Sequence, residues 1–186
     1  MRRGLWAALL GLAVLALTGC AMGESAPAAE APLANQADIH FSQQMIPHHQ
    51  QSIQVAELAA QRATSEFVKS TAEEIRMQET AEVGTMSGWL RSWKAEVPST
   101  SGHSGHSGHS MEGMLTEDQI AALSAASGPE FDRLWLTTMA QHLGNGVRMA
   151  TAVLASGQHT ETRALAQNIV TEQNAQIAAI NGQLAG

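Results

Sequence analysis

Apolar residues recur every three to four positions along most of the chain, which is the pattern of amphipathic helices. Four long stretches carry this pattern, at about 35–62, 66–94, 129–155 and 160–184, and a short one lies between the second and the third. Residues that favour helix starts precede or open them: Asn35 or Asp38, Thr64 or Ser65, Thr116 with Gln119, Pro129, and Thr160. No strand-like alternation is present, so the sequence predicts an all-α fold.

The same periodicity predicts which side chains of the second helix are buried. We expect this buried line to comprise Phe67, Ile75, Gln78, Glu82 and Met86, with Trp89, Leu90 and Trp93 closing its end. Two histidines are expected at the surface: His40, and His159 in the loop before the last helix.

The chain matches itself without a gap over about fifty residues when it is shifted by 94 positions. The shift aligns Met45 with Met139 and His48 with His142. Alanine matches arise easily by chance in so Ala-rich a chain, but a Met-x-x-His motif at the same position of both halves does not. The repeat halves span about 38–90 and 132–184, which indicates a duplicated helical hairpin. Two such hairpins bury their apolar faces against each other, so we predict a four-helix bundle as a single domain over 35–186, in which His48 and His142 face each other.

Candidate chemistry is concentrated at Met45-Ile46-Pro47-His48-His49. Met45 and His49 share a helix face, with His48 beside them, so one turn of helix supplies a thioether and two imidazoles. Sulfur from Met together with nitrogen from His suits copper, especially copper(I). The alternative is that these side chains simply pack in the core of a helix bent at Pro47.

A linker over 99–115 separates the halves and contains the repeat Ser-Gly-His. The repeat contains no apolar residue and cannot pack, so we expect residues 99–113 to be poorly ordered. Short His-rich tracts are typical of metal binding, although a polar spacer with incidental histidines is an alternative. The accessory metal ligands predicted here are His103, His106, His109, Met111 and Met114.

The N-terminus reads as an export signal. Arg2 and Arg3 precede an uncharged run over 5–17 that is short for a mature membrane span, and the run ends in Leu-Thr-Gly-Cys20. This end resembles a bacterial lipobox, which implies a signal peptide at 1–19 and a mature chain that begins with a lipidated (palmitate-type) Cys20. Residues 20–34 then form a flexible tether to a domain on the outer face of the membrane, on the periplasmic or extracellular side.

The net charge of the chain limits the classes of binding partner. Loss of Arg2 and Arg3 shifts the formal net charge from −7 to −9, which argues against binding nucleic acid or anionic lipid by charge. Cys20 is the only cysteine, tyrosine is absent, and no nucleophile-elbow or phosphate-loop motif occurs, so we expect no enzyme. The expected partners are the membrane and a metal ion, with a homo-oligomer and a metal-transfer protein left open.

Across 38–184 the sequence resembles the family called domain of unknown function 305, often described as ferritin-like. The first half carries Met45, Ile46, His48, His49, Gln78, Glu82, Met86, Trp89 and Leu90 of the family pattern; the linker carries Met111, Gly113 and Met114; the second half carries Phe131, Asp132, Met139, His142, Met149 and Ala150. The resemblance implies a ferritin-like helical bundle, and because some members are exported copper-binding proteins it also implies copper as the bound metal.

The second half departs from that pattern. Leu143 stands where the family has a second histidine, and Gln176 and Ile180 stand at its later Glu and Met positions. We therefore expect one lopsided site whose candidate ligands are Met45, His48, His49, Glu82, Met86, Met139, His142 and Met149.

Three functions compete on these residues. The first is copper(I) binding or sequestration in metal homeostasis, which suits an oxidising compartment because no thiolate is needed. The second is a zinc or iron site, although no Glu-x-x-His motif of a di-iron bundle is present. The third is a metal-free structural or adaptor bundle at the cell envelope.

Overall fold

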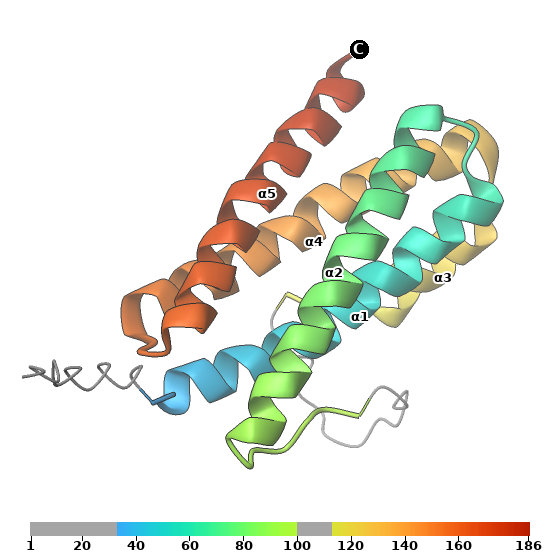
Figure 1. Ribbon diagram of the computed structural model, residues 1–186. Coiled ribbons are helices and arrows are strands. Elements are labelled where there is room, and N and C mark those ends of the chain that lie inside the picture. The colour runs from blue at the N-terminus through green and yellow to red at the C-terminus, as the bar shows by residue number, and fades with distance from the viewer. Residues whose placement is uncertain (1–32, 100–112) are drawn as a thin grey trace, which may run out of the picture. The chain divides into compact units, whose positions relative to one another are not determined.

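The computed structural model describes residues 33–99 and 113–186 (Figure 1). These residues form five helices and, within the described ranges, no strand: α1 (Gln36–Arg62), α2 (Glu66–Ser92), α3 (Glu117–Ala125), α4 (Gly128–Ser156) and α5 (Thr160–Ala185). The predicted all-α fold is confirmed, with four long helices and a short α3. None of the described helices is both long and apolar enough to cross a membrane.

Side-chain caps fix most helix starts where the sequence predicts them. Asn35 accepts from the backbone of Asp38 at 3.1 Å, and the Asp38 carboxylate accepts in return from the Asn35 N–H at 2.8 Å. Thr116 and Gln119 form the same capping box at α3. The prediction for α5 was wrong, because its N-cap is His159 and not Thr160. The ring Nδ1 of His159 accepts from the Thr162 N–H at 3.2 Å.

α1 and α2 pack as one hairpin and α4 and α5 as a second, and α1 packs against α4 where the hairpins meet (Figure 1). Two aspartates 94 positions apart fasten each hairpin to the loop of the other. Asp132 of α4 accepts from Thr64 and Ser65, at the loop before α2, with N···O distances of 3.1 Å and 2.9 Å. Asp38 of α1 accepts from the backbone of Gln158 and His159, at the loop before α5, at 3.0 Å and 3.1 Å. The duplication read from sequence is therefore repeated in the contacts.

The core consists of two apolar clusters. The first contains Val55, Ile75, Phe131, Trp135 and Ile180, and the second contains Phe41, Met45, Met86, Val153 and Ile169. The second cluster uses the early residues of α1 and α5 and the late residues of α2 and α4, and the first uses the opposite ends. The middle of each long helix therefore lies between the clusters, and a set of buried polar residues occurs there, whereas Asp38 and Asp132 are buried near the starts of α1 and α4.

Candidate metal centre

A buried polar layer occupies the space between the two apolar clusters. Each long helix contributes to it, and every member is at most 7% exposed: His48, His49, Glu79, Glu82, His142 and Gln173. Burial of so many polar groups is costly unless each finds a partner. The partners divide the layer into a neutral histidine pair and a charged cluster.

The neutral pair is His48 of α1 and His142 of α4. Their rings stack with centroids 3.8 Å apart and planes inclined by 3°. His142 Nε2 lies 3.2 Å from the backbone oxygen of His48, whereas both ring nitrogens of His48 are buried and have no hydrogen-bond partner. A buried imidazole with both nitrogens unpaired is expensive in an apolar core, so the nitrogens of His48 are candidates for binding a cation. Because the stacked rings direct their lone pairs along parallel planes, the rings would have to turn for both to bind one ion.

Burial keeps both rings of the pair uncharged. Desolvation, helped by the charges of His142 and His49, places the pKa of His48 well below its ordinary value of 6.5. Desolvation also lowers the pKa of His142 to about 4, although the hydrogen bond of its ring to the backbone oxygen of His48 opposes the shift. Neutral imidazole is the form that ligates metals, so at neutral pH both rings offer a lone pair.

The charged cluster consists of His49, Glu79 and Glu82. His49 Nε2 lies 2.6 Å from a Glu82 oxygen, and Nδ1 lies 3.5 Å from a Glu79 oxygen. Burial opposes the charge on His49, yet the two carboxylates raise its pKa above 6.5. Burial also raises the pKa of Glu79 to about 7, and Gln173 Nε2 donates to Glu79 at 3.2 Å.

This arrangement separates His49 from the neutral pair in chemical role. The carboxylates face opposite nitrogens of the His49 ring, so they do not converge with it on one point. Within 33–99 and 113–186, no group of three or more His, Cys, Asp and Glu side chains is placed to hold a metal ion. A site built from imidazole and carboxylate alone, as zinc or iron would use, therefore finds no preformed geometry in the described residues.

Thioethers flank the neutral pair. Met45 and Met139 stand three residues before His48 and His142, one helical turn away, and both are fully buried. Met86 is also fully buried and belongs with Met45 to the second apolar cluster, against which the half-buried Met149 packs. Two neutral imidazoles with methionines within one turn form a donor set that suits copper(I) and does not suit hard cations.

The remaining predictions concern Cys20, the ligands expected in the linker, and the two histidines expected at the surface. Cys20, His103, His106, His109 and Met111 lie outside the described residues, and Met114 is described and half-buried. His40 is exposed as predicted. The surface prediction for His159 was wrong, because its ring packs edge-on against Trp89 and Trp93, with centroids 5.5 Å and 5.0 Å away.

Two members of the polar layer were missed from sequence. The predicted buried line on α2 included Phe67 and Gln78, which are only half-buried, and it omitted Glu79, which is 2% exposed. Glu79 and its partner Gln173 are 94 residues apart, so the duplication was the signal that could have found both.

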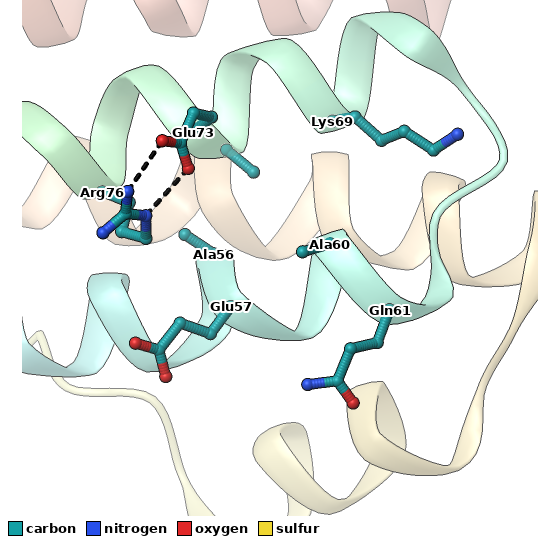
Figure 2. Close-up of a pocket in the computed structure, with 8 residues that line it drawn as sticks. Ala56, Glu57, Ala60, Gln61, Lys69, Glu73 and Arg76 are labelled. Atoms are coloured by element: carbon teal, nitrogen blue, oxygen red, sulfur yellow. Dashed lines mark hydrogen bonds and ion pairs between the residues drawn. The ribbon is translucent and has the colours of Figure 1, made fainter.

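Two surface grooves lie outside the polar layer. One, of about 590 Å³ between α1 and α2, is lined by Ala56, Glu57, Ala60, Gln61, Lys69, Ala72, Glu73 and Arg76 (Figure 2). Arg76 pairs with Glu73 across one turn of α2, at 2.7 Å and 2.8 Å. The groove contains no histidine or methionine, so it is not the metal centre. A second groove of about 360 Å³, between α1 and α4, is lined in part by His40, Arg148 and Met149.

Comparisons with known proteins assign the chain to a family. The sequence profile of the family described as "Domain of unknown function (DUF305)" matches residues 38–184. The chain belongs to this family. No curated protein matches the chain.

Solved structures show the same DUF305 fold. A DUF305 protein from Streptomyces coelicolor, described as a candidate secreted protein, is 26% identical over 80% of this chain and 91% of that chain, with a TM-score of 0.71. CopM in the Cu(II)-bound form is 30% identical over 80% of this chain and 95% of that chain, with a TM-score of 0.69. CopM in the Cu(I)-bound form is 28% identical over 78% and 94%, with a TM-score of 0.65.

Proposed function

We propose that this DUF305 protein binds and sequesters copper(I) outside the cytoplasm, in metal homeostasis. The observation that carries the proposal is the stacked pair of His48 and His142, in which two neutral imidazoles are buried and the nitrogens of His48 have no partner. His48 and His142 would hold the ion, and Met45 or Met139 would add sulfur. Copper supplies a soft cation that accepts imidazole and thioether without requiring thiolate.

The residues of this chain account for how such an ion would be kept. Burial holds His48 and His142 unprotonated, so protons compete weakly for the ligand nitrogens. The charged cluster balances the cation of His49 with Glu79 and Glu82, which limits its repulsion of a second cation nearby. The copper-bound forms of CopM support copper over zinc or iron for this fold.

The proposal covers export and anchoring as well. The lipobox-like sequence before Cys20 supports a domain that is held at the membrane by an acylated first residue rather than by a helix. The likeness to the candidate secreted protein from Streptomyces coelicolor supports export. The proposed role is binding, because the buried layer presents imidazole ligands with buried thioethers one helical turn away.

Two measurements on full-length protein test this function. Protein purified from the cell envelope without added metal should contain copper in preference to zinc or iron, by mass spectrometry of the metals. The Cys20→Ser variant should leave the membrane fraction while keeping its copper. Absence of bound metal, together with no copper(I) binding on titration, would favour the structural or adaptor bundle instead.

A further inference from the structure

The chain segment that leads into α3 is fastened at the stacked histidines by two side chains. Asn145 of α4 donates from Nδ2 to the Gly113 oxygen at 2.6 Å. Gln51 of α1 accepts from the Leu115 N–H at 2.6 Å and donates to the Leu115 oxygen at 3.1 Å. The segment Gly113–Leu115, which we call the strap, is therefore held at the seam between α1 and α4.

The two fastening residues occupy equivalent places in the duplicated halves. Gln51 stands three residues after His48, Asn145 stands three residues after His142, and the two are 94 positions apart. Each lies one helical turn from its histidine on the same side of its helix. The strap thus spans the seam, with Gly113 fastened to α4 and Leu115 to α1, each one helical turn from a member of the stacked pair.

The strap lies close to α4 at Gly113. Gly113 has φ +95°, which favours glycine, and a Cβ there would lie 2.8 Å from the Cβ of Asn145. Met114 follows one peptide unit later and is held on both sides, by Asn145 through Gly113 and by Gln51 through Leu115.

We propose that Met114 is a thioether ligand of the metal at His48 and His142, and that Gln51 and Asn145 are positioning residues that hold it there. This inference rests on the proposed function. Met45 and Met139 are fully buried, whereas Met114 is half-buried on a segment fastened one helical turn from each histidine, so solvent can reach its thioether. A ligand from a free loop loses conformational entropy when it binds a metal. Because the backbone is already held at both neighbours of Met114, this loss is smaller.

The ligand role is tested by substituting Met114→Leu in the full chain, with Met77→Leu as the matched control, because Met77 is 59% exposed on α2. We expect copper(I) affinity to fall tenfold or more for Met114→Leu and to stay at the parental value for Met77→Leu. X-ray absorption at the copper edge should show one sulfur fewer around the metal in Met114→Leu. Parental affinity with an unchanged sulfur count would overturn the ligand role while leaving copper binding itself intact.

The positioning role is tested with Gln51→Leu and Asn145→Leu, alone and combined with Met114→Leu. Each single change should weaken copper(I) binding, and neither should weaken it further once Met114 is Leu, since both act through that residue. In metal-free protein, hydrogen exchange at the Leu115 amide should accelerate in Gln51→Leu and not in Met114→Leu. Parental copper affinity in both fastening variants would overturn the positioning role. A parent that binds no copper(I) would overturn this inference together with the proposed function.

Discussion

His48 and His142 stack at a centroid distance of 3.8 Å, and the sequence places them at equivalent positions of two duplicated hairpins. The contact follows from the duplication. Residues at the same depth on α1 and α4 meet where the hairpins pack together, so one motif, Met-x-x-His, provides both sides of the site. The same relationship joins Glu79 to Gln173 at 3.2 Å.

The pKa values of this pair predict how the metal-free protein responds to acid. His48 and His142 have lowered pKa values in the folded state, so the unfolded chain binds more protons as the pH falls below 6.5. Their contribution to stability is present above 6.5 and is lost as the pH falls. A shift from 6.5 to about 4 for His142 corresponds to about 3 kcal/mol.

Glu79 and His49, whose pKa values are raised, act in the opposite direction, so a difference between variants isolates the pair. His142→Gln should lose less unfolding free energy than the parent between pH 7 and pH 4.5, measured by urea denaturation. Nitrogen-15 spectra of the rings should show His142 neutral at pH 6. A doubly protonated His142 at that pH would contradict the account of its burial.

We predict that the members of the charged cluster depend strongly on one another for their contribution to the unfolding free energy. His49→Leu copies Leu143 of the second half but leaves Glu79 and Glu82 buried without their cation, which should cost about 3 to 5 kcal/mol of unfolding free energy. Adding Glu79→Gln and Glu82→Gln completes the arrangement of the second half, where Gln173 and Gln176 stand, and should recover most of that loss. Chemical denaturation of the single and triple variants gives both values. Equal stability of the two variants would show that the carboxylates do not depend on His49.

Asp38 and Asp132 each accept hydrogen bonds from the loop of the other hairpin, so we predict that removing either one lowers the unfolding free energy equally. Asp132→Ala removes the acceptor for the backbone of Thr64 and Ser65 and should lower the unfolding free energy by about 2 to 3 kcal/mol. Asp38→Ala should do the same, because Gln158 and His159 lose the equivalent acceptor. The exposed Glu74→Ala should change it by less than about 0.5 kcal/mol. An Asp132→Ala variant as stable as Glu74→Ala would refute the role of these contacts.

We predict that the His-rich linker affects how many copper ions bind but not the affinity of the tightest site. Deletion of residues 101–110 should lower the number of copper ions bound and leave the tightest site unchanged, because the helix-borne ligands are positioned by packing. Equilibrium dialysis gives the number, and competition with a copper(I) chelator gives the affinity. Loss of the tightest site on deletion would make the linker histidines principal ligands.

Much of the fold was predictable because local and repeated signals agreed. Asn35, Ser65 and Thr116 cap helices as their residue types favour, and the shift of 94 positions gave the pairing of the halves. His159 was not predicted as a cap because histidine is an unusual choice there. Its equivalent in the first half is the cap Ser65, so the repeat contained the information that residue type did not.

Most members of the candidate site were predictable from the sequence, including His49 and Glu82 of the charged cluster, but Glu79 and Gln173 were not. His48 and His142 followed from the duplication, whereas the burial of Glu79 contradicts the preference of carboxylates for solvent and depends on His49 and Gln173 from other helices. The contacts of Gln51 with Leu115 and of Asn145 with Gly113 depend on where the linker returns to the bundle. No helical periodicity encodes that return.

The central claim is that His48 and His142 together hold copper(I), and competition titration with a copper(I) chelator tests it most directly. His48→Ala and His142→Ala should each weaken binding by about tenfold or more, a loss of at least about 1.4 kcal/mol, while both variants stay folded and helical. His40→Ala, at an exposed histidine of α1, should bind as the parent does. Parental copper(I) affinity in both His48→Ala and His142→Ala, together with a sharp fall in their thermal stability, would show that the stacked histidines are core residues and contradict the account.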